Sequence, residues 1–194
     1  MIPMSMIEDF PQWNGAGVLP PVKPGELGNS SKRSPYTTSL TGFIERFATS
    51  QQRINILRGF LEFRAQLHAI GIVSGFQWLD GSFLENIEDL EGRTPNDMDV
   101  VTFFELPTGE LQQQVLQKNI QIFDPVYDKK TYKVDAYFAP LKRELDEKSV
   151  RQIAYWYSMW SHRRNGVWKG FLQVDLEPSQ DAAALPLLAT KSEA

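Results

Sequence analysis

The sequence predicts an α+β domain in which a small mixed β-sheet is flanked by helices. Its 194 residues, 42% of them hydrophobic and 23% charged, are typical of one folded domain. Short apolar runs bounded by turn residues alternate along the chain with segments of helical spacing. The chain shows no internal repeat. Wholesale disorder, a collagen-like repeat and a coiled-coil rod are excluded by these features.

Residues 1–40 predict an irregular N-terminal arm. Half of the twelve prolines fall within the first 35 residues, among glycines and serines, and no helical or strand periodicity is visible there. Four apolar residues can pin the arm to the domain: Phe10, Trp13, Val18 and Leu19. The first ten residues carry two acids and no basic region, so we expect no secretory signal.

Residues 41–177 predict the folded domain. The helical spacing of apolar residues from Ser50 onwards predicts a helix that ends at Gly71. The expected strands span 76–79, 98–104, 131–138 and 170–176, and the other expected helices span 83–90, 107–123 and 141–164. In the last helix we expect an inner face of Val150, Ile153, Ala154, Tyr157 and Trp160. Residues 178–194, rich in alanine and serine, predict a flexible tail.

Composition excludes several classes of protein. Without cysteine the chain has no disulfide, thiolate-bound zinc, iron–sulfur cluster or thiol nucleophile. Only two histidines are present, which disfavours a histidine-rich metal site. A net charge of −4 argues against a general nucleic-acid coat, and no apolar run has the length of a membrane span. We therefore expect a cytoplasmic protein with no membrane partner.

The net charge hides a segregation of acids and bases. Residues 83–110 hold eight acids and one base, whereas residues 148–170 hold five bases and no acid. Such segregation suits a site that holds a cation and an anion together. Two solvated faces of opposite sign explain it equally well.

A Gly-Ser pair and three aspartates are the candidate site. Gly81 and Ser82 follow an expected strand, where a glycine lets a phosphate approach the backbone and a serine hydroxyl can bind it. Asp97 and Asp99 enter the strand 98–104 two residues apart, so both carboxylates project from the same face. Their mutual repulsion is relieved by a cation such as Mg²⁺ or Mn²⁺.

The third aspartate, Asp135, lies in the middle of the apolar strand 131–138. An acid there is unfavourable unless it is paired or bound to a metal. If this strand lies beside the strand 98–104, Asp135 completes a cluster of three carboxylates. The alternative is an ion pair between Asp135 and a lysine or arginine at a sheet edge.

These motifs together resemble the DNA polymerase β-like nucleotidyltransferase superfamily. The order is strand, Gly-Ser, spacer, Asp-x-Asp strand and a later strand with one aspartate. Four short motifs are similar to those of an uncharacterised bacterial subgroup of this superfamily. They are Leu-Pro-Pro within 17–21, Leu-Asp-Gly-Ser-Phe at 79–83, the segment Pro95 to Asp99, and Lys169-Gly170. The resemblance covers residues 17–176 and implies the polymerase β-like fold.

The resemblance also implies a function. It makes Asp97, Asp99 and Asp135 the catalytic residues and ligands of Mg²⁺ or Mn²⁺, and Gly81 and Ser82 the nucleotide-binding pair. Apart from the resemblance, three bases after the expected helix 141–164 can reach the phosphates: Arg163, Arg164 and Lys169. Cations are equally well explained there by the helix C-terminus, which favours them without any ligand. The implied reaction transfers NMP from an NTP to an acceptor hydroxyl on a protein or RNA. The alternative is an inactive binding or regulatory module with a partner protein, in a toxin–antitoxin or phage-defence setting.

Overall fold

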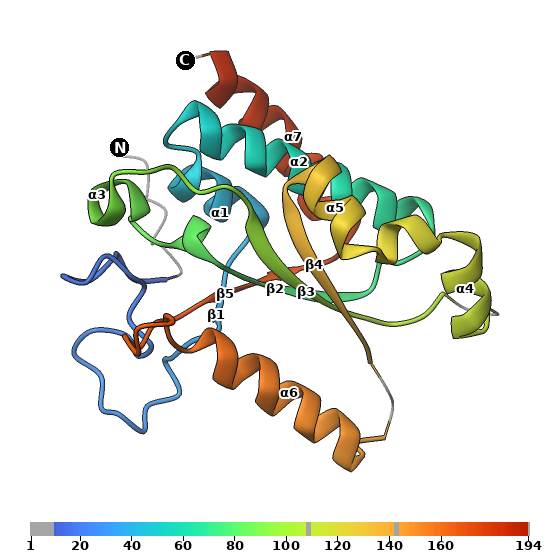
Figure 1. Cartoon of the computed structure of the whole chain (residues 1–194), viewed down its shortest axis with the longest axis horizontal. Helices are drawn as coiled ribbons and strands as arrows, with labels where there is room; N and C mark the ends of the chain where they lie inside the picture. The colour runs from blue at the N-terminus through green and yellow to red at the C-terminus, as the bar shows by residue number, and fades with distance from the viewer. Residues whose placement is uncertain (1–9, 108–109, 142–143, 194) are drawn as a thin grey trace, which may run out of the picture.

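The protein, seen in a computed structural model, has one five-stranded sheet with helices on both faces (Figure 1). Residues 10–107, 110–141 and 144–193 are described. The strands are β1 (Tyr36–Thr37), β2 (Gly75–Asp80), β3 (Met98–Phe104), β4 (Val134–Pro140) and β5 (Leu172–Asp175). The α-helices are α1 (Leu40–Phe47), α2 (Gln51–Ala69), α3 (Ile87–Glu91), α4 (Gln112–Lys118), α5 (Pro125–Tyr132), α6 (Glu147–Trp160) and α7 (Pro178–Glu193). Two 3₁₀ turns, Ser82–Leu84 and Ile120–Phe123, complete the order.

The sheet is mixed, in the order β1-β5-β2-β3-β4. Strand β2 is antiparallel to both β3 and β5, whereas β3 and β4 are parallel, as are β1 and β5. A parallel neighbour needs a crossover connection, and between β3 and β4 the chain passes through α4 and α5. The expected mixed sheet in an α+β domain is therefore confirmed, and the condition under which Asp135 joins the other acids, adjacency of the strands that carry Asp99 and Asp135, is met.

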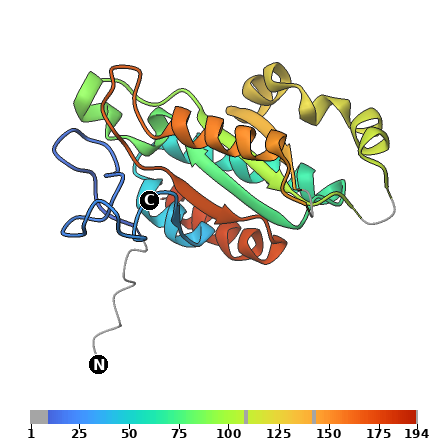
Figure 2. The ribbon, with the colours of Figure 1, turned by 90° about the horizontal axis from the view of Figure 1, so that it is seen from below.

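The helices cover the two faces of the sheet unequally. Helices α1, α2, α5 and α7 lie over one face, and α6 crosses the other (Figures 1 and 2). Trp78, Tyr137 and Phe171 line the α6 face, where their rings contact Tyr157, Trp156 and Trp160 of α6 respectively. Because side chains alternate along a strand, Val100 and Val134 point to the other face and are fully buried there.

The long helix expected after Ser50 is confirmed as α2. The Ser50 side chain accepts a hydrogen bond from the Arg53 amide, which caps the helix. Gly71 follows the helix with a positive φ, the backbone conformation at which glycine ends many helices.

Helices α1 and α5 differ from expectation for different reasons. Helix α1 has an apolar stripe at helical spacing that we did not expect before Ser50, with Leu40, Phe43, Ile44 and Phe47 buried, whereas α5 has little apolar periodicity and is marked mainly by its cap. Ser39 caps α1, which lies in a segment where we expected no helix. Asp124 caps α5 and is followed by Pro125, a residue suited to the first helical turn. Helix α5 therefore contains Tyr132, and the strand expected at 131–138 lies at 134–140 instead. The helix expected over 107–123 is shorter: α4 followed by a 3₁₀ turn.

The C-terminal segment forms α7 where we expected a flexible tail. Ala184 and Leu188 of α7 are buried, and the helix packs against α1 and α2. An ion pair between Asp181 and the fully buried Arg64 of α2 adds a polar anchor. Apolar burial and this pair supply the contacts that a flexible tail lacks.

Helix α6 is confirmed, but the expected inner face is partly wrong. Val150, Ile153 and Ala154 are exposed, whereas Trp156 and Trp160 are buried. The larger aromatic rings bury more apolar area against the sheet than the aliphatic side chains would, so they set the rotation of the helix.

The N-terminal arm is irregular over 10–35, as expected, and then contributes β1 to the sheet. Val18 and Leu19 are buried, and the Tyr36 hydroxyl donates to the Pro20 carbonyl at 2.7 Å. The prediction about a secretory signal falls on residues 1–9, outside the described residues. Among the helices of the described ranges, none combines the length and the apolar character that crossing a membrane requires.

Candidate active site

A row of carboxylates crosses three strands on the α6 face of the sheet. In the strand register Asp80 of β2 is opposite Asp99 of β3, and Asp99 is opposite Asp135 of β4. Residues opposite one another in neighbouring strands project to the same face. Asp97 precedes Asp99 by two residues and lies immediately before β3, which begins at Met98. The structure thus brings together the three aspartates that the sequence singled out, and adds Asp80.

A lysine ammonium lies between two of these carboxylates. Lys129 Nζ of α5 is 2.9 Å from Asp97 Oδ2 and 3.0 Å from Asp135 Oδ2. The ion-pair alternative for Asp135 is therefore present in the structure. The pair is not an isolated one at a sheet edge, because the same ammonium holds Asp97 as well. The Lys129 ammonium therefore links the carboxylate that precedes β3 to a carboxylate of β4.

The carboxylates line a groove of about 740 Å³. Gly81 and Ser82 lie at one part of its wall, and the loop after α6 lies at another. The lining also includes three cationic side chains from the connection between α6 and β5: Arg163, Arg164 and Lys169. All eight predicted site residues therefore line one groove.

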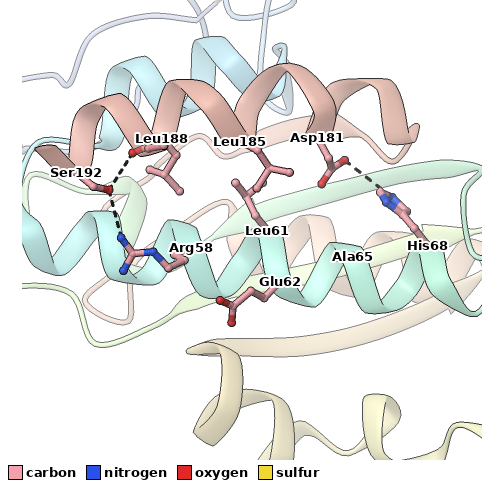
Figure 3. Close-up of a pocket in the computed structure, with 10 residues that line it drawn as sticks. Arg58, Leu61, Glu62, Ala65, His68, Asp181, Leu185, Leu188 and Ser192 are labelled. Atoms are coloured by element: carbon pink, nitrogen blue, oxygen red, sulfur yellow. Dashed lines mark hydrogen bonds and ion pairs between the residues drawn. The ribbon is translucent and has the colours of Figure 1, made fainter.

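A second cavity, of about 510 Å³, lies between α2 and α7 on the other face of the sheet (Figure 3). Its wall is largely apolar, with Leu61, Leu185 and Leu188. The polar groups around it are held by the helices themselves: Arg58 donates to the Ser192 hydroxyl at 3.2 Å, and Ser192 donates to the Leu188 carbonyl (Figure 3). This cavity is smaller than the carboxylate groove and holds none of the predicted site residues.

Gly81 is required where β2 passes into the loop. Its φ is +88°, a conformation that side chains rarely adopt, and an added Cβ would lie 2.9 Å from Asp99 Oδ2. A side chain at this position would therefore push against the central carboxylate. Ser82, the next residue, begins a 3₁₀ turn and lines the groove.

A buried arginine that the sequence analysis missed holds this loop in place. Arg53 of α2 is fully buried and donates to the carbonyls of Phe83 and Glu85 at 2.6 and 2.7 Å. It also forms two hydrogen bonds to the Glu88 carboxylate. From the arm, Trp13 Nε1 donates to the Leu84 carbonyl at 2.7 Å. The sequence did contain a signal for Arg53: a charged residue occurs within the apolar stripe of α2, which indicates a buried charge with partners elsewhere.

The segregated charges of the sequence meet in space. Lys169 Nζ is 2.8 Å from Asp80 and 3.2 Å from Glu85, and all three side chains are buried. Arg163 pairs with Glu85 at 3.0 Å and also with Glu91. Two bases of the second segment therefore pair with two acids of the first, Glu85 and Glu91, so the segments are in part partners of each other. Lys169 lines the groove with its ammonium already held by two carboxylates.

Burial changes the proton affinity of the central acids. Burial raises the pKa of Asp99 to about 6, with further contributions from the charges of Asp135 and Asp97. Burial likewise raises the pKa of Asp80 to about 7, although Lys169 opposes the shift. The hydrogen bond to Asp97, with that to Asp135, raises the pKa of Lys129 above its usual range. Lys129 is therefore charged at neutral pH while Asp99 is close to its titration range.

We expect Asp99→Asn to stabilise the metal-free protein at pH 7.5 and to do so less at pH 5. The folded-state pKa of Asp99, about 6, lies above the ordinary value of 3.8 for aspartate, so the ionised form is disfavoured by folding. The penalty is present above pH 6 and fades towards pH 4. At pH 7.5 it amounts to about 3 kcal/mol. Urea denaturation of both proteins at both pH values measures it, and a difference that does not depend on pH contradicts the assignment.

The carboxylates supply the oxygen ligands that Mg²⁺ and Mn²⁺ prefer. Within the ranges the structure describes, no group of three or more histidine, aspartate or glutamate side chains is arranged to hold a metal ion. The ammonium of Lys129 lies where two of the oxygens converge. The donor chemistry fits a divalent cation, and the shared ammonium shows that Asp97 and Asp135 can contact one cation together.

The comparisons with known proteins place the chain in a family. The model of a family of unknown function, DUF6932, matches residues 11–175, which is most of the chain. The chain therefore belongs to this family. No curated protein and no solved structure gives a significant match. The family match spans the arm, the Gly-Ser pair and all three predicted aspartates.

Proposed function

We propose that this protein is a metal-dependent nucleotidyltransferase of the polymerase β-like kind. In the reaction an acceptor hydroxyl on a protein or RNA attacks the α-phosphorus of an NTP. The bond from that phosphorus to the oxygen that leads to the β-phosphate breaks, pyrophosphate leaves, and the hydroxyl proton passes to solvent or a carboxylate. One observation carries the proposal: Asp97, Asp99 and Asp135 face one groove beside Gly81 and Ser82.

The roles follow from the positions of the residues. Asp97, Asp99 and Asp135 would hold Mg²⁺ or Mn²⁺, which when bound neutralises phosphate charge and polarises the reacting oxygens. Ser82 and the backbone at Gly81 would contact the terminal phosphates. Because phosphoryl-group chemistry depends mainly on positioning and electrostatics, the chain needs no other nucleophile.

The acidic loop after β2 does not oppose an anionic substrate as strongly as its composition indicates. Glu85 is neutralised by Lys169 and Arg163, and Glu88 is held by Arg53 on the side of α2. Glu91 pairs with Arg93 and Arg163. Arg164 is an exposed base of the groove wall, and in the proposed reaction it would contact a phosphate.

Transfer of labelled nucleotide tests the proposal. Purified protein is incubated with each of the four α-labelled NTPs, Mn²⁺ or Mg²⁺, and a cell extract, and the products are separated as protein and RNA. We expect label in one macromolecular fraction with at least one NTP, and none when the metal is chelated. Labelling that persists in the chelator, or that never exceeds an incubation without the protein, contradicts the proposal.

A second candidate function is a binding or regulatory module that lacks catalysis. The observation that favours it is the set of ion pairs in the groove, in which Lys129 and Lys169 already neutralise carboxylates. A catalytic site has to exchange at least one of these cations for a metal. Binding of NTP without transfer in the same assay would support this second function.

A further inference from the structure

We propose that Lys129 is a built-in counter-ion that a divalent metal must displace from Asp97 and Asp135, so that this lysine sets the metal affinity of the site. This inference rests on the proposed function, because it assigns a regulation of the same site. In the metal-free protein the ammonium keeps the carboxylates together. In the metal-bound protein the same carboxylate oxygens would be ligands of the metal.

The backbone of Lys129 is held by the packing of α5, whereas its half-exposed side chain has room to change rotamer. Helix α5 is packed so closely on α2 that a Cβ added at Gly59 would collide with the carbonyl oxygen of Tyr132. Directly after α5, Lys133 adopts a left-handed conformation and the chain enters β4. The Lys129 side chain is 50% exposed. Its ammonium can therefore leave the carboxylates by rotation of side-chain bonds while the helix stays in place.

The charges of the cluster favour an exchange of cations. Asp97, Asp99 and Asp135 carry three negative charges when ionised, and Lys129 supplies one positive charge. Among the described residues Asp99 forms no ion pair of its own, although it lies between the other two acids in the strand register. Lys169 does not fill this role, because its ammonium is held by Asp80 and Glu85. A divalent cation neutralises the cluster better than one ammonium does, but it meets that ammonium at the shared oxygens.

The competition predicts opposite effects of one substitution on metal affinity and on metal-free stability. In Lys129→Met the metal no longer competes with an ammonium, so its affinity rises. The metal-free protein loses two ion pairs and retains the repulsion between carboxylates, so its melting temperature falls. Lys129→Arg retains the positive charge, so a metal still has to compete with a cation at the shared oxygens and the affinity should not rise.

Mn²⁺ alone is the probe, titrated by calorimetry into the full chain at fixed ionic strength. We expect Lys129→Met to bind Mn²⁺ about tenfold more tightly than the wild type, a factor that corresponds to about 1.4 kcal/mol. Thermal melts with and without Mn²⁺ are expected to show a larger metal-induced shift in that variant. Lys130→Met, which removes a neighbouring exposed lysine of α5, controls for a general change of surface charge.

The outcomes separate this inference from the proposed function. Equal or weaker Mn²⁺ binding by Lys129→Met, with clear binding by the wild type, overturns the inference and leaves the metal site standing. An equal gain in Lys130→Met also overturns it, because the effect is then a general one. Absence of Mn²⁺ binding in both the wild type and Lys129→Met overturns the metal site and the inference with it. If the Met variant does not fold, Lys129→Gln provides the same comparison.

Discussion

Replacing Asp97 and Asp99 together by asparagine is expected to abolish Mn²⁺ binding and to reduce nucleotidyl transfer on the order of 10³-fold or more. Asp97 lies immediately before β3 and Asp99 lies near its start, and both face the groove. Asparagine retains the size of the side chain but removes the charge that attracts a divalent cation. The transfer assay and a Mn²⁺ titration measure the two losses separately.

The same double variant is expected to fold without loss of stability. Asp99 is disfavoured in its ionised form, as its raised pKa of about 6 indicates, so asparagine relieves that penalty. Asp97 loses an ion pair to Lys129, whose side chain is half exposed, which costs about 1 kcal/mol or less. The two effects oppose each other. Urea denaturation without metal should therefore give a free energy of unfolding equal to that of the wild type or higher.

Asp89→Asn is the matched control for the double variant. Asp89 is an exposed acid of α3, accepts a hydrogen bond from Asn86 and is not among the residues that line the groove. Its replacement should change neither Mn²⁺ binding nor transfer. Wild-type transfer by the double variant would show that the carboxylates of β3 are not catalytic.

The carboxylate row was predictable because it depends on local patterns. Side chains alternate along β3 and β4, so Asp99 and Asp135 project from one face of the sheet while Val100 and Val134 project from the other. Both patterns are visible in the sequence. The parallel pairing of β3 with β4 was stated only as a condition, because register between distant strands is set by the whole fold. The polymerase β-like fold itself remains a proposal, with a mixed five-stranded sheet in its support.

The partners of the charged groups were not predictable, because they come from distant parts of the chain. Lys129 precedes β4 in a helix that the apolar spacing did not show, and it meets Asp97 from 32 positions away in the sequence. The bases expected to bind phosphate are paired with acids: Arg163 with Glu85 and Lys169 with Asp80. Segregation of charge along the chain did not decide between a binding site and two solvated faces, and only the approach of Arg163 and Lys169 to Glu85 in space shows that these groups pair.

Arg53→Met is expected to destabilise the protein by about 3–5 kcal/mol, since a buried polar anchor is lost while its partners remain. Arg53 is fully buried and donates to the Phe83 and Glu85 carbonyls. Methionine fills much of the space but leaves both carbonyl oxygens buried without a donor. Urea denaturation at low temperature and without metal measures the loss.

Glu88→Gln separates the ion pair of Arg53 from its backbone contacts. The Glu88 side chain is 32% exposed, so water can replace part of its pairing with Arg53. This substitution should cost about 1 kcal/mol or less, because both backbone hydrogen bonds of Arg53 remain. If Arg53→Met costs no more than Glu88→Gln, Arg53 does not anchor the loop. If the larger loss is found, the folded fraction of Arg53→Met should still bind Mn²⁺ through β3, but it should bind NTP more weakly, because the loop that carries Gly81 and Ser82 has lost its support.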